Sequence, residues 1–319
     1  MKTKQVLKAC SMVVGVALAM AAAPAFAGGV VTSGNGAVTI GVETIGSLGF
    51  SNVGINKAGV GDAITPGCVC ESWGVSANGI AGWAGNDTGQ FNLGIGNGSG
   101  LFGNSFVSNT YLLSLTGLTI SQVYTPSANG NLIRNRVTFT NTSDAALTDL
   151  RYTRAMDWDV PPTPFNELVT IGGVGASALL FSNDNGFAVA NPLINPNALF
   201  GGTTNVNFMD VGPGDHGAFF TFGFGDLAAG MSKEFDIFYG AADNEREAFE
   251  ALAAVGAEVY SLGQSSGNGG AGTPATFIFG FAGVGGIPVA EVPEPASLAL
   301  LGLGLMGMAA RGRRRKAAK

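Results

Sequence analysis

Charged residues are scarce in this chain. Only 12% of its 319 residues are Asp, Glu, Lys or Arg, about half the usual share of ~25%. No long block of like charge precedes the last nine residues, which argues against a nucleic-acid binder with a broad basic face. Between the two ends no run of about 20 apolar residues occurs, which excludes a protein with several membrane-spanning helices.

Histidine and cysteine are also rare. The one histidine, His216, cannot build a metal site from several histidines. Cys10 falls in a predicted signal peptide, so the mature chain keeps Cys68 and Cys70. Export to an oxidising compartment permits a disulfide between these two. Free thiols, pairing with another chain and metal ligation remain alternatives.

Residues 1–27 have the three parts of a secretory signal peptide, the substrate of signal peptidase. The basic region, the apolar region and the small-residue cleavage site are, in order, Lys2, Lys4 and Lys8, then Met12 to Ala23, then Ala25-Phe26-Ala27. We therefore predict that the protein is exported and that residues 28–290 form the exported domain.

Residues 291–319 show a second tripartite pattern. Pro293 and Pro295 stop any upstream helix, and an apolar run of 15 residues then covers 296–310. This run is shorter than the ~20 residues of a full span, so we predict a short transmembrane helix. Six basic residues end the chain and would hold the tail on the cytoplasmic side. The basic stop, in 311–319, comprises Arg311, Arg313, Arg314, Arg315, Lys316 and Lys319.

The tail resembles the PEP-CTERM sorting domain of exported proteins in Gram-negative bacteria. The resemblance rests on Val292-Pro293-Glu294-Pro295 (292–295), followed by the short helix and the basic end. It implies processing by a membrane-bound exosortase, a cysteine-type transpeptidase. It also implies a transient stay in the inner membrane, followed by delivery to the cell surface or to an extracellular, biofilm-type matrix. The resemblance implies nothing about the chemistry of residues 28–290.

The exported domain is acidic. Without the signal peptide and the tail, seven basic and 20 acidic residues remain, which gives a net charge of −13. A domain with this charge is soluble and repels anionic surfaces, and it could hold divalent cations.

The pattern of apolar residues predicts a mainly β domain. Apolar and polar residues alternate over 133–140 and 150–160, with turn residues at 141–144 between them. Shorter strand signals occur in the Gly-rich segment 28–103 and at 168–171, 178–181, 218–224, 233–239 and 276–281. One amphipathic helix is expected from Asp243, as its cap, to Val255. Many short strands with Gly-rich turns and one helix indicate an antiparallel β-sandwich.

Three carboxylates form the candidate site. Asp157 and Asp159 share a strand face, and Glu167 follows shortly after Pro161-Pro162. They could pair with Arg134, Arg136 or Arg151 as structural ion pairs. Alternatively, their oxygens could bind a hard cation such as Ca²⁺. A third alternative is the acid and base of a glycosidase.

These features favour an exported, non-enzymatic surface or matrix protein with a binding or structural role. Extracellular polysaccharide is the expected ligand class, and nucleic acid is not an expected partner. Trp73, Trp83 and Trp158 either pack in the core or stack on sugars. The competing hypothesis is a secreted enzyme that acts on polysaccharide through Asp157, Asp159 or Glu167.

Overall fold

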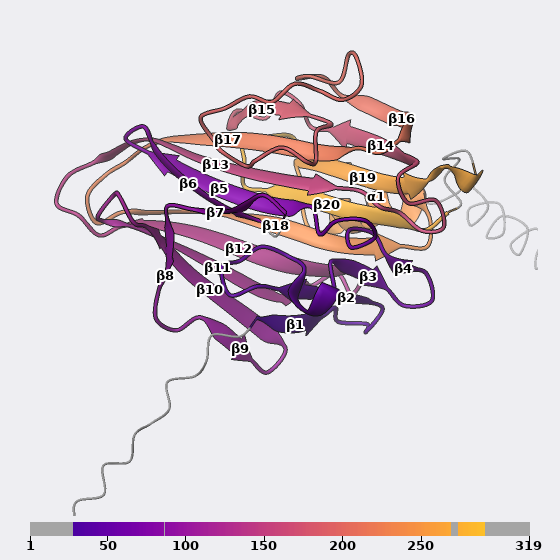
Figure 1. Cartoon of the computed structure of the whole chain (residues 1–319), viewed down its shortest axis with the longest axis horizontal. Coiled ribbons are helices and arrows are strands. Elements are labelled where there is room, and N and C mark those ends of the chain that lie inside the picture. The colour runs from indigo at the N-terminus through magenta and orange to yellow at the C-terminus, as the bar shows by residue number, and fades with distance from the viewer. Residues whose placement is uncertain (1–27, 86, 269–273, 291–319) are drawn as a thin grey trace, which may run out of the picture.

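The computed structural model describes residues 28–85, 87–268 and 274–290. In this part the chain is mainly β, with three antiparallel sheets and one α-helix (Figure 1). None of the helices described here is long and apolar enough to cross a membrane. The predicted signal peptide, the short helix 296–310 and the basic stop lie outside the described residues.

The largest sheet has ten strands. They are β8 (Leu93–Ile95), β9 (Gly100–Phe102), β10 (Ser105–Leu112), β11 (Leu118–Pro126), β12 (Leu132–Asn141), β14 (Glu167–Gly172), β16 (Phe208–Gly214), β18 (Ser232–Ala242), β19 (Val259–Ser265) and β20 (Thr276–Ala282). Their order is β16-β14-β19-β20-β18-β12-β11-β10-β8, and β9 also pairs with β10. Some neighbours are consecutive strands, such as β10, β11 and β12, but the pairs β12-β18 and β14-β19 join strands about 100 residues apart, so the sheet also depends on long-range pairing.

The other two sheets have six and four strands. The six-stranded sheet, in the order β15-β17-β13-β5-β6-β7, comprises β5 (Glu71–Ala77), β6 (Ile80–Gly85), β7 (Gly89–Phe91), β13 (Leu147–Asp157), β15 (Leu179–Asn183) and β17 (Gly217–Leu227). The four-stranded sheet comprises β1 (Gly29–Thr32), β2 (Val38–Val42), β3 (Ile55–Lys57) and β4 (Gly61–Asp62). It contacts β11, β12 and β18 of the ten-stranded sheet. Two short 3₁₀ helices lie at Phe50–Asn52 and Ser266–Asn268.

The main core lies between the two larger sheets. The rings of Phe222 in β17 and Phe281 in β20 have centroids 4.8 Å apart. The rings of Phe139 in β12 and Tyr152 in β13 have centroids 6.0 Å apart. Successive side chains of a strand point to opposite faces, so the alternation in the sequence supplies one apolar face from each sheet. The two sheets therefore pack face to face through aromatic side chains.

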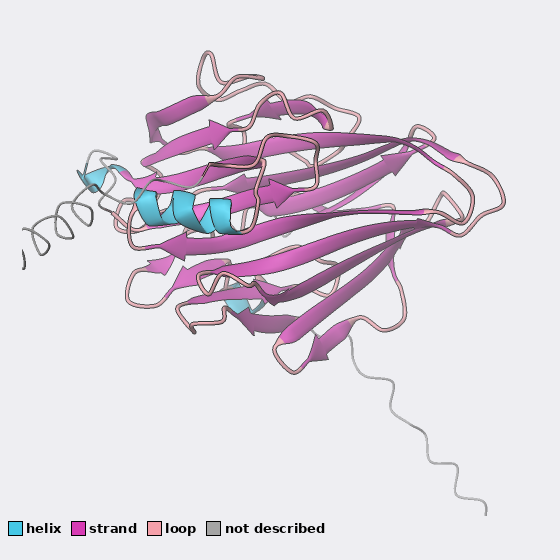
Figure 2. Cartoon of the chain, turned by 180° about the vertical axis from the view of Figure 1, so that it is seen from behind, coloured by secondary structure: helices cyan, strands magenta, loops and turns pink. Residues whose placement is uncertain are grey.

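The helix α1 (Glu245–Ala254) covers the outer face of the ten-stranded sheet (Figure 2). Asn244 caps it, because its side chain accepts a hydrogen bond from the Glu247 backbone N–H at 3.0 Å. The expected cap, Asp243, was wrong by one residue: its carboxylate instead binds Lys57 at 2.7 Å. The helix buries its apolar face in a second cluster that contains Leu132, Phe238, Ala242, Ala248, Ala251, Leu252, Ala257, Leu262 and Ile278.

The predicted turn at 141–144 carries the chain from one sheet to the other. β12 pairs with β11 and β18, whereas β13 pairs with β5 and β17, so the two strands are not hydrogen-bonded to each other. Asn141 fixes this crossing, because its side-chain amide donates to the carbonyl oxygens of Ala145 and Leu227, each at 2.8 Å.

A buried ion pair lies within the six-stranded sheet and faces the core. Arg154 of β13 donates from Nε to the carboxylate of Glu71 in β5, and both side chains are 0% exposed. Its Nη1 donates to Gln122 Oε1 at 2.9 Å and to the Tyr152 hydroxyl at 3.0 Å. Its guanidinium also lies 5.5 Å from the centre of the Tyr239 ring, within the range of a cation–π contact. Through Gln122 of β11 and Tyr239 of β18, the Arg154 guanidinium therefore links the six-stranded sheet to the ten-stranded sheet.

Candidate functional site

The end of strand β13 places the candidate carboxylates. The backbone N–H of Asp157 donates to the Cys70 carbonyl at 2.9 Å, and that of Asp159 donates to the Ala63 carbonyl at 2.8 Å. Met156 belongs to the main core, and side chains alternate along a strand. The Asp157 side chain therefore points away from that core.

Four carboxylates gather at this point, and we name them the carboxylate cluster: Asp157, Asp159, Glu167 and Asp215. One oxygen each of Asp157, Asp159 and Asp215 lies within 4.8 Å of the others. Asp215 lies in the turn between β16 and β17, opposite the end of β13. Glu167 is the first residue of β14, and its charge acts on both Asp157 and Asp159. Three separate segments of the chain thus converge.

Three of the four side chains are buried. Asp157 is 1% exposed, and Asp159 and Glu167 are 0% exposed, whereas Asp215 is exposed. Among the described residues, neither oxygen of Asp159 or Glu167 has a hydrogen-bond partner. One oxygen of Asp157 also lacks a partner there. Buried charges are normally paired or bound to a metal, so this arrangement is costly as it stands.

Burial and mutual repulsion raise the pKa values of the cluster. Burial, followed by the charges of Asp159, Asp215 and Glu167, raises the pKa of Asp157 to about 9. Burial and the charges of Glu167, Asp215 and Asp62 raise the pKa of Asp159 to about 8. Burial raises the pKa of Glu167 to about 7, although nearby backbone N–H groups oppose the shift. Burial also raises the pKa of Asp215, and His216 opposes it.

The interpretation of these carboxylates as structural ion pairs is wrong. Arg136 binds Asp236 at 2.9 Å, and Arg151 binds Asp149 at 2.9 Å. Arg134 forms no ion pair in the described part of the chain, and its Nε has no hydrogen-bond partner there. Within the same residues, no basic side chain pairs with the carboxylate cluster. Arg136 meets Asp236 through the pairing of β12 with β18, whereas Arg151 meets Asp149 on its own strand, two residues away.

A buried Asp–His pair supports the turn that carries Asp215. His216 Nδ1 lies 3.1 Å from Asp184 Oδ2, and His216 Nε2 lies 3.0 Å from the Val211 carbonyl. Asp184 also accepts from the Thr203 hydroxyl at 2.8 Å. Burial alone would raise the pKa of Asp184, but these hydrogen bonds and two from backbone N–H groups lower it. The loop after β15 is thereby tied to the turn.

The sequence did not reveal Asp184 and Asp215 as members of this site. One signal was present: both residues lie in Gly-containing turns, 183–186 and 213–217. A Cβ atom at Gly186 or Gly217 would overlap the Met156 carbonyl oxygen. Glycine is therefore required where both turns press on the end of β13.

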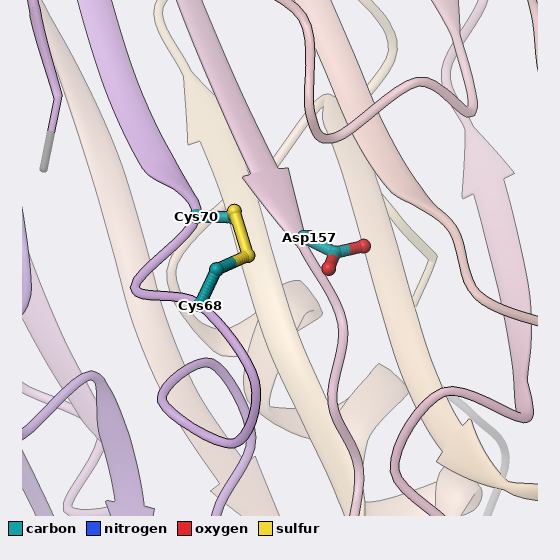
Figure 3. A group of neighbouring side chains, drawn as sticks. All are labelled: Cys68, Cys70 and Asp157. Carbon is teal, nitrogen blue, oxygen red and sulfur yellow. A yellow bond between two sulfur atoms is a disulfide. The ribbon is translucent and has the colours of Figure 1, made fainter. Parts of the chain in front are cut away.

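Cys68 and Cys70 form a disulfide beside the cluster, with Cα atoms 5.2 Å apart. Figure 3 shows the disulfide next to the Asp157 side chain. Both Sγ atoms and an Asp157 oxygen lie within 4.8 Å of one another. Sulfur in a disulfide is not a thiolate, the form of cysteine that binds metals. In this form the two cysteines shape the site and do not ligate.

Two of the three tryptophans are core residues and cannot stack on a sugar. Trp73 and Trp158 are 0% exposed, and the Trp158 indole donates to Ser261 Oγ at 3.0 Å. Trp83 is half-buried, and its ring stacks on exposed Phe91 with the centroids 4.4 Å apart. Of the three tryptophans, only Trp83, together with Phe91, therefore offers an aromatic surface to solvent.

The described residues and the tail together define an exported, mainly β protein with a C-terminal sorting signal. Residues 291–315 match the family model of the PEP-CTERM protein-sorting motif. The chain therefore carries this motif, which implies export, processing by exosortase and sorting to the cell surface. No curated protein gives a significant match to the chain.

Proposed function

We propose that the chain is a non-enzymatic protein of the cell surface or biofilm matrix. In this proposal its β-sandwich binds extracellular polysaccharide after exosortase has removed the tail. The observation that carries the proposal is the sorting motif at residues 291–315, because it assigns the place where the domain works. The net charge of −13 for residues 28–290 adds support, since an acidic domain stays soluble outside the cell.

The aromatic pair of Trp83 and Phe91 supports the choice of polysaccharide. The two residues face each other on β6 and β7, at the edge of the six-stranded sheet. Phe91 is 53% exposed. Flat aromatic surfaces at solvent bind the apolar faces of sugar rings while the hydroxyl groups stay hydrated. The pair is therefore the candidate contact for a polysaccharide.

The alternative, a glycan-acting enzyme that uses Asp157, Asp159 or Glu167, has weaker support. A general acid must reach the glycosidic oxygen, and a nucleophile must reach the sugar carbon. Asp159 and Glu167 are 0% exposed and Asp157 is 1% exposed, so a polymer has no access to them in this conformation. Their raised pKa values would otherwise suit an acid catalyst.

One experiment tests whether the motif directs the protein to the cell surface. Alanine replacement of Pro293, Glu294 and Pro295 is expected to leave unprocessed protein in the inner membrane, while the parent is recovered at the surface. Fractionation with an antibody against the β-domain measures this. Normal surface delivery of the variant would overturn the role of the motif.

A second experiment tests the ligand. The parent and the Phe91→Ala variant are incubated with extracellular polysaccharide from the expressing cells and sedimented. We expect Phe91→Ala to reduce binding, whereas Phe102→Ala, which truncates a similarly exposed ring on β9, should not. Equal binding by all three proteins would remove the aromatic pair from the proposal. Steady release of reducing sugar by the parent would favour the enzyme.

A further inference from the structure

We propose that the carboxylate cluster binds one hard divalent cation, with Ca²⁺ as its natural occupant. Every donor in the cluster is a carboxylate oxygen, the ligand type that Ca²⁺ prefers. The assignment concerns Asp157, Asp159 and Asp215 as direct ligands and Glu167 as the fourth carboxylate. It does not rest on the proposed function, because a cation site can exist in a protein with any role at the surface.

The spacing of the oxygens suits one ion. Oxygens that touch the same Ca²⁺ from opposite sides are separated by about twice the Ca–O distance of ~2.4 Å, which is about 4.8 Å. One oxygen each of Asp157, Asp159 and Asp215 lies within 4.8 Å of the other two. A single ion can therefore lie close to coordination distance from all three, and small side-chain rotations would complete the contacts.

The buried oxygens without partners are an independent reason to expect an ion. Asp159 and Glu167 are 0% exposed, and none of their four carboxylate oxygens has a hydrogen-bond partner among the described residues. Glu167 belongs to β14 of the ten-stranded sheet, whereas Asp157 ends β13 of the six-stranded sheet. The fold thus brings unsatisfied acceptors from different sheets near enough for the charge of Glu167 to act on Asp157 and Asp159. A cation bound by Asp159 would satisfy oxygens that otherwise have no partner.

Asp215 gives the carboxylate cluster an opening to solvent, through which an ion can enter and water can complete the coordination. Asp215 is exposed, so the cluster reaches solvent on its side. Ca²⁺ takes six to eight oxygen ligands, typically including water, and an exposed edge leaves room for water. Mg²⁺ holds its water ligands more tightly and requires a nearly ideal octahedron, so a buried set of bare carboxylates suits Ca²⁺ better.

The disulfide offers the competing assignment. Reduction would convert Cys68 and Cys70 to thiolates beside Asp157, a set that suits Zn²⁺ rather than Ca²⁺. With the disulfide intact, only the carboxylates are available as ligands. The redox state of the cysteines during metal binding therefore distinguishes the two sites.

Terbium luminescence tests the proposal, because Tb³⁺ replaces Ca²⁺ at oxygen sites and emits when a nearby tryptophan is excited. Trp158 lies between Asp157 and Asp159 in the chain, so it is the tryptophan closest in sequence to the proposed ligands and the expected energy donor, although its indole points to the core. The purified full chain, with its disulfide intact, is titrated with Tb³⁺ and then with Ca²⁺. We expect one saturable site per chain and loss of emission as Ca²⁺ displaces Tb³⁺.

Two variants and a control complete the test. Asp157→Asn with Asp159→Asn should abolish the sensitised emission. Asp215→Asn, a change at an exposed position that should not disturb folding, should weaken Tb³⁺ binding by roughly tenfold or more. Asp87→Asn with Asp144→Asn removes the same charge from exposed positions and should bind as the parent does.

Three results would overturn the assignment. The first is binding to the Asp157 and Asp159 double variant at the affinity of the parent. The second is equal weakening by the control variant, which would show a general effect of charge. The third is binding that appears only after reduction of the disulfide, which would assign the metal to Cys68 and Cys70.

Discussion

Replacement of Glu71 by glutamine tests the buried ion pair of the core. Glutamine keeps the size of the side chain, and its carbonyl oxygen can still accept the hydrogen bond from the Leu48 N–H, which is 2.8 Å long in the parent. The substitution removes the negative charge that faces Arg154. The other partners of this guanidinium are neutral: the Gln122 amide oxygen, tyrosine hydroxyls and the Gly46 carbonyl.

The expected loss is large because Arg154 is 0% exposed. Leaving one partner of a buried ion pair uncompensated costs about 3–5 kcal/mol. Whole domains unfold with only about 5–15 kcal/mol, so the variant should lose a large fraction of its stability. The melting temperature should fall on the order of 10 °C, since each kcal/mol corresponds to roughly 2–4 °C in a domain of this size.

A double-mutant cycle measured by urea unfolding separates the pair from the rest of the network. Arg154→Met alone should also destabilise, but adding it to Glu71→Gln should recover most of the loss, because no charge is then buried. Gln122 Oε1 would keep its bond from Asn135 at 2.9 Å. The control is Arg136→Met, which breaks the ion pair with Asp236. The Arg136 side chain is 41% exposed, so this variant should lose under about 1 kcal/mol of stability.

The reasoning fails if the two core substitutions are additive. Coupling within about 0.5 kcal/mol of zero would show that Glu71 and Arg154 do not act as a pair. A Glu71→Gln variant as stable as the parent would likewise refute the expected cost of an unpaired guanidinium. A fall in the slope of the unfolding curve would instead indicate a change in the denatured or native ensemble, so that slope is compared throughout.

Three further predictions concern the site and the tail. With a chelator present, raising the pH from about 6 to about 8 should lower the free energy of unfolding, by ~1.4 kcal/mol per pH unit for each proton that the folded state retains. The reason is that folded Asp157, with its pKa raised to about 9, keeps a proton that the unfolded chain has already lost. Urea melts at several pH values measure this, and the free energy of unfolding should depend less on pH after Asp157→Asn with Asp159→Asn. Deletion of residues 311–319 should release unprocessed protein to the periplasm, as seen by fractionation, and normal processing would contradict a retention role. Alkylation and mass measurement of the exported protein under non-reducing conditions should find Cys68 linked to Cys70 and no free thiol.

Local pattern predicted which face each strand buries, but not which strands pair. The alternation over 150–160 correctly separates Tyr152, which lies in the main core, from Asp157, which points away. The same pattern cannot place Arg136 beside a particular acid, because its register depends on a strand about 100 residues away. Arg136 thus meets Asp236 through the pairing of β12 with β18.

The site shows the same limit. Asp157 and Asp159 were recognisable because two acids in one strand must share a face. Asp215 was not, because its place depends on the register in which Gly217 opposes Asp157. The outward face of β13 is buried in part by the loop after β15, because Ala155 packs in one cluster with Ala190. Burial, which determines how costly the charges are, is therefore a property of the whole fold.

A proton and a cation compete for the buried carboxylates, and the free energies of protonation and of cation binding show which form is favoured. At pH 7, a proton held on Asp157, whose ordinary pKa is 3.8, costs roughly 4 kcal/mol relative to the unfolded chain. A ligand that binds only the folded state stabilises it by ~4.1 kcal/mol at about 1,000 times its Kd. Calcium at that ratio would therefore offset the whole cost for this residue, and the ionised, cation-bound form would be favoured. Because acidification restores the advantage of the proton, Ca²⁺ should raise the melting temperature strongly near neutral pH and progressively less toward pH 5.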